Sequence, residues 1–125
     1  MIKVLIIDDE PLIAKMFAQA LPSAEFQVTT VLHSDEAVDV AQQQKPDIIL
    51  LDIMMPEPNG MSVLDALKAQ EMTKAIPVIM LTNLSGKYDV ETAKAHGALD
   101  YWVKNDIEVG SLGSRIQEVL KRIMQ

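Results

Sequence analysis

Five short apolar segments alternate along the chain with longer segments of helical periodicity. Three of the apolar segments, 2–7, 47–51 and 76–81, are apolar at almost every position, which is typical of strands buried on both faces of a parallel sheet. Two more strands are expected at 26–31 and 98–103. The alternation of strands and helices predicts a (βα)5 fold, a three-layer sandwich with helices on both faces of a five-stranded parallel sheet.

The first helical segment spans residues 10–21. Pro11 suits its first turn, because the N–H that proline lacks would be unpaired there. The apolar residues of this segment fall on one helical stripe that we expect to face the core: Leu12, Ile13, Met16, Phe17, Ala20 and Leu21. We also interpret Met16 and Met80 as core-filling residues rather than members of a functional cluster.

Four further helices are expected between and after the remaining strands. Ser34 is a good N-cap for the second helix, because two acidic residues follow it at the positive end of the helix. Gly60 opens the third helix, and the fourth runs over 84–96 and ends at Gly97. The fifth helix, over 107–124, should bury Ile116, Val119, Leu120 and Ile123.

Composition restricts the classes of protein that fit. The chain has 125 residues, 49% of them hydrophobic, which suits one soluble domain that fills 1–125. No apolar stretch approaches the roughly 20 residues that a membrane helix needs, and the N-terminus lacks the cleavage site of a signal peptide. The absence of cysteine excludes disulfides and favours a cytoplasmic setting. The net charge of −7 argues against direct nucleic-acid binding.

Polar residues stand where the predicted strands end. Asp8 and Asp9 follow the first strand, Asp52 follows the third, Thr82 follows the fourth and Lys104 follows the fifth. In such sheets the ligand site lies beyond the carboxyl ends of the strands, so these side chains should meet. Three carboxylates would repel one another there, and a hard cation such as Mg²⁺ would remove the conflict. A lysine and a threonine to bind an anion complete the requirements of a phosphoryl-transfer site.

No arrangement of serine or cysteine with histidine competes for this role, so a carboxylate is the best candidate nucleophile. His33 and His96 have no metal-ligand spacing, and we interpret both as surface residues. Four motifs occur in order at the strand ends: "IIDDE" (6–10), "DIILLDIMMPEPNG" (47–60), "PVIMLT" (77–82) and "HGALDYWVKND" (96–106). Together they resemble a response-regulator receiver domain of two-component signalling, the CheY-like domain of flavodoxin-like topology, from end to end.

The resemblance implies a role for each acid. Asp52 is the phosphoacceptor, and Asp9 and Asp52 hold Mg²⁺ directly while Asp8 acts through water. The backbone carbonyl of Met54 completes the share of the metal shell that the protein supplies. Glu10 is left to support the start of the first helix.

The resemblance also implies how the phosphoryl group is bound and sensed. Thr82 and Lys104 bind its oxygens, and Tyr101 is the aromatic switch residue that turns inward when Thr82 moves. Trp102 points to the other face of the strand and should be plain packing. The implied partners are a sensor histidine kinase or a histidine phosphotransfer protein, and a downstream output controlled through the fourth helix, fifth strand and fifth helix, the surface that can also form a dimer. Such a domain is a signalling module that catalyses only its own phosphoryl transfer.

Two positions depart from the family pattern beside the site. Lys104 is usually followed by a proline in a cis peptide, and here Asn105 follows. A cis bond before a residue other than proline costs about 3 kcal/mol, so either the bond is cis under strain or the loop runs differently. The residue after Thr82 is usually small, and here it is Asn83, which could narrow access to the phosphate or add a hydrogen bond.

Met54 and Leu84 occupy positions where the family tunes the loss of phosphate. Polar side chains there can orient an attacking water, whereas two apolar ones exclude water and cannot orient it. We therefore expect slow autodephosphorylation and a long-lived signal.

Other functions predict other features. A receiver that acts as an unphosphorylated scaffold should lack the acids or the lysine, and this chain has all of them. A phosphatase of the haloacid-dehalogenase type needs Asp-x-Asp after the first strand, whereas this chain has Asp8-Asp9-Glu10. A flavodoxin needs a Ser/Thr/Gly-rich phosphate loop at that position, which is missing. The sequence leaves open whether the domain acts alone or within a DNA-binding regulator or hybrid kinase.

Overall fold

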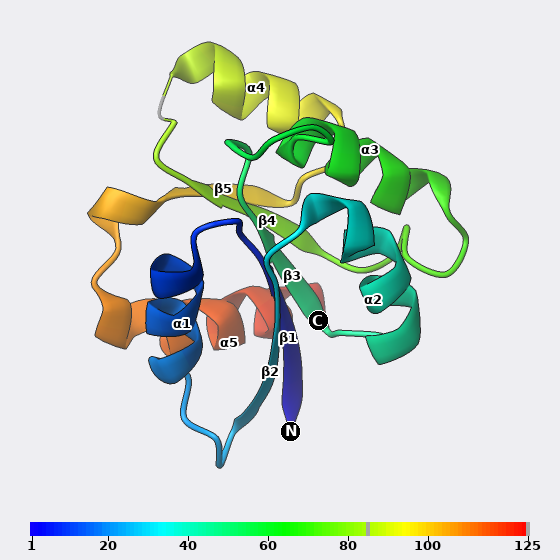
Figure 1. The fold of residues 1–125 in the computed structure, drawn as a ribbon. Helices are drawn as coiled ribbons and strands as arrows, with labels where there is room; N and C mark the ends of the chain where they lie inside the picture. Colours follow the sequence, from blue (N-terminus) through cyan, green and yellow to red (C-terminus); the bar gives the residue numbers. More distant parts are fainter. Residues whose placement is uncertain (85, 125) are drawn as a thin grey trace.

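Five parallel strands form one sheet in the order β2-β1-β3-β4-β5, which is the flavodoxin-like order (Figure 1). The computed structural model describes residues 1–84 and 86–124. The strands are β1 (Ile2–Ile7), β2 (Phe26–Val31), β3 (Ile48–Leu51), β4 (Val78–Thr82) and β5 (Asp100–Val103). The predicted (βα)5 fold is therefore confirmed, with strand ends shifted by up to two residues.

Helices cover both faces of this sheet, as Figure 1 shows. They are α1 (Pro11–Gln19), α2 (Ala37–Gln44), α3 (Gly60–Ala69), α4 (Lys87–Ala95) and α5 (Leu112–Ile123). Short 3₁₀ turns at Ser34–Glu36, Lys104–Asp106 and Val109–Ser111 precede α2 and α5. Among the described residues, no helix is long and apolar enough to cross a bilayer.

The alternation of side chains along β1 divides the core into two layers. Val4 and Ile6 pack with α1 and α5, whereas Leu5 and Ile7 pack with α2 and α3. All four are almost completely buried, since successive strand residues point to opposite faces and both faces are covered. The segment is therefore apolar at nearly every position. Asp8, the residue that follows β1, lies at the carboxyl edge of the sheet.

The predicted stripe of α1 is partly wrong. Leu12 is 82% exposed and Met16 is 39% exposed, whereas Ala14 and Phe17 form the buried face. Spacings of three and four residues connect the buried positions of this segment, and Leu21 continues them. Leu12 lies two residues from Ala14 and Met16 one residue from Phe17, so at 3.6 residues per turn both point away from the buried face. Only Met80 of the two predicted core methionines is buried.

Two other helix predictions need correction. Ser34 does not cap α2, because a 3₁₀ turn comes first and the Ser34 hydroxyl donates to the carbonyl of Pro56 at 3.3 Å. In α5, Ile116 and Val119 are buried and Leu120 is partly buried, but Ile123, the last residue of the helix, is 47% exposed.

The predicted boundaries of α3 and α4 agree more closely with the structure. Gly60 opens α3 as predicted, and the side-chain oxygen of Asn59 caps the helix by accepting the N–H of Ser62 at 3.0 Å. Gly97 ends α4 with a φ of 108°, a conformation that glycine adopts at little cost. The helix begins at Lys87, later than predicted, and Ser85 of the predicted range lies outside the described residues.

Candidate functional site

Three charged side chains meet at the carboxyl edge of the sheet. Asp8 follows β1, Asp52 follows β3 and Lys104 follows β5, and all three are buried. The Nζ atom of Lys104 lies 2.6 Å from Oδ2 of Asp8 and 3.0 Å from Oδ2 of Asp52. One ammonium group is therefore shared between two carboxylates that the sequence predicted to meet.

Burial and charge act in opposite directions on this group. Burial raises the pKa of Asp8, and the hydrogen bond from Lys104 only partly reverses the effect. Burial alone would lower the pKa of Lys104, but its hydrogen bonds to Asp8 and Asp52 outweigh burial, so its pKa is raised. Lys104 is thus a fixed cation at neutral pH, shared between two acidic side chains.

Backbone N–H groups fix the direction of both carboxylates. Oδ1 of Asp8 accepts the N–H of Glu10 at 3.0 Å, and Oδ1 of Asp52 accepts the N–H of Met54 at 3.2 Å. Each bond reaches two residues along the chain, which is the local turn that aspartate favours. The second oxygen of each carboxylate is left to face Lys104.

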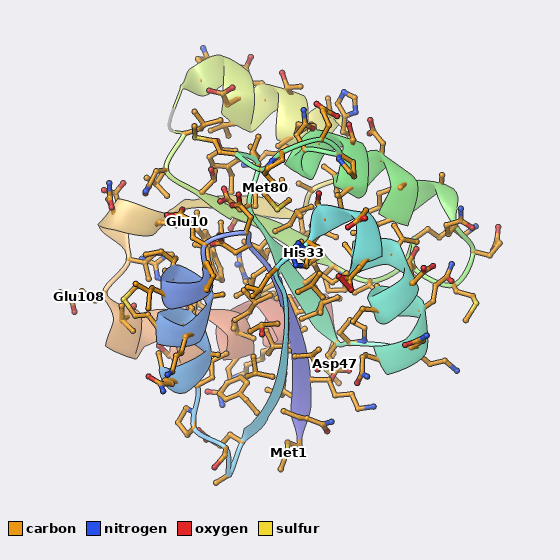
Figure 2. All side chains as sticks on the ribbon, in the orientation of Figure 1. Met1, Glu10, His33, Asp47, Met80 and Glu108 are labelled. Carbon is orange, nitrogen blue, oxygen red and sulfur yellow. The ribbon has the colours of Figure 1, made fainter. Side chains whose placement is uncertain are left out.

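Glu10 joins this site, although the sequence suggested only a role at the start of α1. Carboxylate oxygens of Asp8, Glu10 and Asp52 all lie within 4.8 Å of one another, and Oε1 of Glu10 is 3.7 Å from Nζ of Lys104. Figure 2 shows Glu10 above α1 at this edge of the sheet. The signal in the sequence was the spacing, since Asp8 and Glu10 are two residues apart and an extended chain points such residues the same way. Glu10 is the N-cap of α1 by position but makes no capping hydrogen bond with its side chain.

These oxygens suit a hard divalent cation, because Mg²⁺ prefers a few carboxylate oxygens and water. Asp9 is partly buried and lines the cavity over Asp52, but it is not one of the three acids whose oxygens converge. The predicted direct contact of Asp9 with a metal therefore stays a prediction, as do the water-mediated role of Asp8 and the carbonyl ligand from Met54.

A cavity of about 210 Å³ opens over Asp52. Thr82 is fully buried in its wall, and the Thr82 hydroxyl oxygen lies 3.4 Å from the N–H of Leu84, which points toward it. The lining residues include four of the predicted anion-binding or tuning residues: Met54, Thr82, Asn83 and Lys104. The cavity therefore places a cation and a hydroxyl beside the carboxylate, as binding of a phosphoryl group would require.

Tyr101 is connected to the same loop. Its hydroxyl donates to the carbonyl of Leu84 at 2.6 Å, and burial, with the charges of Asp89 and Asp52, raises its pKa to about 12. Trp102 points to the opposite face and packs in the core beside α5, which confirms its predicted packing role. Tyr101 therefore stays protonated at neutral pH and holds the chain two residues beyond Thr82.

The loop after Lys104 runs differently from the family pattern. Among the described residues the one cis peptide bond joins Glu57 and Pro58, so the bond between Lys104 and Asn105 is trans. The chain then forms a 3₁₀ turn, and the N–H of Asn105 donates to Oδ1 of Asn83 at 3.0 Å. Lys104 still reaches both carboxylates in this arrangement.

The two histidines lie outside this site. His33 is exposed, and Figure 2 labels it beside α2. His96 is also exposed, and its Nδ1 lies 2.6 Å from Oδ1 of Asp65, which links α4 to α3. The interpretation of both as surface residues is confirmed.

A doubly wound α/β domain with two buried aspartates, a lysine and a threonine at its carboxyl edge has the arrangement expected of a signalling receiver domain. Comparison with known proteins identifies the family. The family model of the response regulator receiver domain matches residues 4–117. The chain belongs to the response regulator receiver domain family of two-component systems.

Curated relatives are transcriptional regulators. The chain is 39% identical over 122 residues to the probable transcriptional regulator ycf27 of Guillardia theta, covering 96% of this chain and 46% of that protein. It is 34% identical to the phosphate regulon transcriptional regulatory protein PhoB of Pseudomonas aeruginosa, covering 95% and 52%. The chain thus spans about half the length of the curated relatives it matches.

Solved structures agree with the fold. The chemotaxis protein CheY4 of Vibrio cholerae superposes with a TM-score of 0.86 at 32% identity, covering 95% of this chain and 98% of that one. The BeF3-activated N-terminal receiver domain of RstA from Klebsiella pneumoniae gives a TM-score of 0.85 at 28% identity, covering the same shares. Both similarities extend over nearly the whole of this chain.

Proposed function

We propose that this chain is a phosphorylation-dependent switch that accepts a phosphoryl group on Asp52 from a phosphohistidine. The donor would be a sensor histidine kinase or a histidine phosphotransfer protein in the cytoplasm. The observation that carries the proposal is the position of Asp52, which is 3% exposed, 3.0 Å from the Lys104 ammonium, and at the base of an open cavity. A buried carboxylate that is reached from solvent through a cavity and lies beside a lysine ammonium is well placed to attack phosphorus.

In the transfer, a carboxylate oxygen of Asp52 forms a bond to phosphorus as the P–N bond to imidazole breaks. The imidazole leaves with the electron pair of that bond and takes up a proton from solvent. Lys104 stabilises the charge on the phosphoryl oxygens as they move, and the hydroxyl of Thr82 donates to one of them. The acyl phosphate carries about −1.5 to −2 charge by analogy with other phosphorylated side chains.

The acids fit a magnesium ion. We assign direct contact to Asp9 and Asp52, contact through water to Asp8, and one further ligand to the Met54 carbonyl; the convergence of oxygens from Asp8, Glu10 and Asp52 supports a cation at this position. When bound, Mg²⁺ supplies positive charge that offsets repulsion between the acids and the incoming phosphoryl oxygens.

The signal would leave through Thr82 and Tyr101. Movement of Thr82 toward the phosphoryl group pulls on Leu84, whose N–H faces the Thr82 hydroxyl and whose carbonyl accepts from Tyr101. This shifts the population of the α4–β5–α5 surface between two states, and that surface would contact an output or a second copy. Because the named relatives are transcriptional regulators about twice as long, we favour a role as the receiver part of such a regulator.

We further propose that the acyl phosphate is long-lived. Met54 is 60% exposed at the mouth of the cavity and Leu84 is partly buried near it, and neither side chain can hydrogen-bond an attacking water. Replacing Met54 with asparagine should shorten the phosphate lifetime several-fold, as followed by intact mass after removal of the donor. A wild-type half-life of seconds would contradict this proposal.

The main test is labelling with acetyl phosphate and Mg²⁺, measured by intact mass. The wild type should gain one phosphoryl group and Asp52→Asn none, while Asp39→Asn, on the exposed face of α2, should label as the wild type does. Persistent labelling of the Asp52 variant would refute the assignment. A partner protein that carries a phosphohistidine should then transfer its phosphoryl group to the wild type and not to Asp52→Asn.

A further inference from the structure

One hydrogen bond joins the two loops at the mouth of the cavity. Asn83 directly follows Thr82, Asn105 directly follows Lys104, and Oδ1 of Asn83 accepts the N–H of Asn105 at 3.0 Å. We call this contact the Asn83–Asn105 bridge. It lies one residue away from both groups that would bind phosphoryl oxygens.

The bridge depends on two departures from the family pattern at once. Proline in place of Asn105 would have no N–H to donate, and a small residue in place of Asn83 would have no carbonyl to accept it. The N–H of Asn105 belongs to the peptide that directly follows Lys104. A hydrogen bond to it therefore fixes the plane of that peptide and restricts the direction in which the lysine leaves the backbone.

The side chain of Lys104 makes two ionic contacts at the same time. Its Nζ reaches two carboxylates at once, at 2.6 Å from Asp8 and 3.0 Å from Asp52. A long side chain on a freely moving loop would lose entropy to make both contacts, so an anchor at its own backbone lowers that loss. The loop that carries Asn83 is itself held firmly, because the preceding residue, Thr82, is the last residue of β4 and is fully buried.

We propose that Asn83 is a positioning residue that holds the Lys104 loop against the Thr82 loop and thereby sets the rate of phosphoryl transfer to Asp52. This role rests on the proposed function. Asn83 acts through Lys104 and touches neither reacting atom. The hydrogen bond supplies, with a trans peptide, the restriction on the loop that a proline would impose by its ring.

The size of the effect follows from the kind of bond. Both residues are exposed, so the bridge competes with water and is of the strength of an ordinary net hydrogen bond. Removing it should slow the transfer by about three- to tenfold, the range that such a bond gives when it acts on the barrier. The urea midpoint of unfolding should change little, because only one exposed hydrogen bond is lost and no buried group is left unpaired.

The experiment compares three substitutions in the whole chain. Asn83→Ala and Asn83→Leu both remove the acceptor, but leucine keeps about the same size, and Asn83→Asp keeps an acceptor oxygen. Each is mixed with acetyl phosphate at several concentrations in saturating Mg²⁺, and the rate of Asp52 phosphorylation is followed by intact mass. Gln43→Ala, an exposed amide on α2, serves as the matched control.

We expect equal slowing in the alanine and leucine variants. The aspartate variant should recover the maximal rate but need more donor, because its charge repels the anionic phosphodonor. In parallel, hydrogen exchange of the Asn105 amide, measured by NMR, should be faster in the alanine and leucine variants than in the wild type.

Several results would overturn the role of Asn83. A leucine variant as fast as the wild type beside a slow alanine variant would mean that Asn83 only fills space. Wild-type rates in every Asn83 variant, or an Asn105 amide that exchanges equally fast in all of them, would remove the role while leaving the proposed function intact. Failure of the wild type itself to label would remove the proposed function and this role together.

Discussion

Replacing Gly60 with alanine should destabilise the fold and displace Asp52. Gly60 begins α3, and a Cβ atom at this position would lie 2.0 Å from the carbonyl oxygen of Asp52 and 2.5 Å from Cα of Ile53. The first of these is 1.4 Å short of 3.4 Å, the lower end of ordinary van der Waals contact. Both obstacles are backbone atoms, so no rotation of a side chain can relieve the overlap.

The loss in the free energy of unfolding for Gly60→Ala can be estimated from two opposing effects. Overpacking of a well-packed region costs about 1–3 kcal/mol, and a clash with backbone belongs at the upper end of that range. Alanine recovers at most about 1 kcal/mol through its higher helix propensity. The free energy of unfolding should therefore fall by about 2 kcal/mol or more, which lowers the ratio of folded to unfolded chains about thirtyfold.

Urea unfolding followed by the fluorescence of Trp102, the one tryptophan, measures this change. Gly110→Ala is the matched control, because a Cβ atom there would meet nothing within 4 Å. It should change the free energy of unfolding by no more than about 0.5 kcal/mol. A Gly60 variant as stable as the wild type, or a control equally destabilised, would refute the steric reasoning.

Three further results are expected. Lys104→Met should slow labelling of Asp52 about a hundredfold or more, since it removes a preorganised cation from the cavity; a labelling rate near that of the wild type would remove Lys104 from the mechanism. Thr73→Val should lower the free energy of unfolding by about 1–3 kcal/mol in urea titrations, because the buried Thr73 hydroxyl donates to the carbonyl of Leu67 at 2.6 Å and that carbonyl would lose its partner. The pKa of Asp8 is raised above 3.8, so between the two values the native state keeps a proton that the unfolded chain has released. The stability of the metal-free wild type relative to Asp8→Asn should accordingly fall as pH rises through that interval, and parallel pH profiles for the two proteins would contradict this.

The main site residues could be predicted because their positions need only topology. In a parallel sheet every carboxyl end reaches the same edge, so residues that follow buried strands meet whatever the details of the loops. Asp8, Asp52, Thr82 and Lys104 are such residues, and the structure brings all four together. The nearly continuous apolar runs before Asp8, Asp52 and Thr82 make three of the strands easy to recognise.

The errors have a different origin. Leu12 and Met16 lie on the solvent-facing side of α1, and periodicity alone does not show which of its apolar residues the sheet covers. The position of Glu10 in the sequence indicates a role at the start of α1, whereas its carboxylate is turned toward Lys104. The contact between Asn83 and Asn105 depends on the course of two loops, which no periodic pattern describes.

The charges at the site explain why the fold keeps a cluster of buried ionisable side chains that lowers its own stability. Lys104 is the shared partner of Asp8 and Asp52, and burial makes the Asp8 carboxylate expensive to ionise. A cation that binds only the native chain would return this cost as stability, in proportion to the logarithm of its concentration. A phosphoryl group on Asp52 would instead take Lys104 away from one carboxylate and give it new oxygens to bind. The switch would then work by redistributing the hydrogen bonds of a lysine that is already in place, so its response would depend on how firmly the backbone beside Lys104 is held.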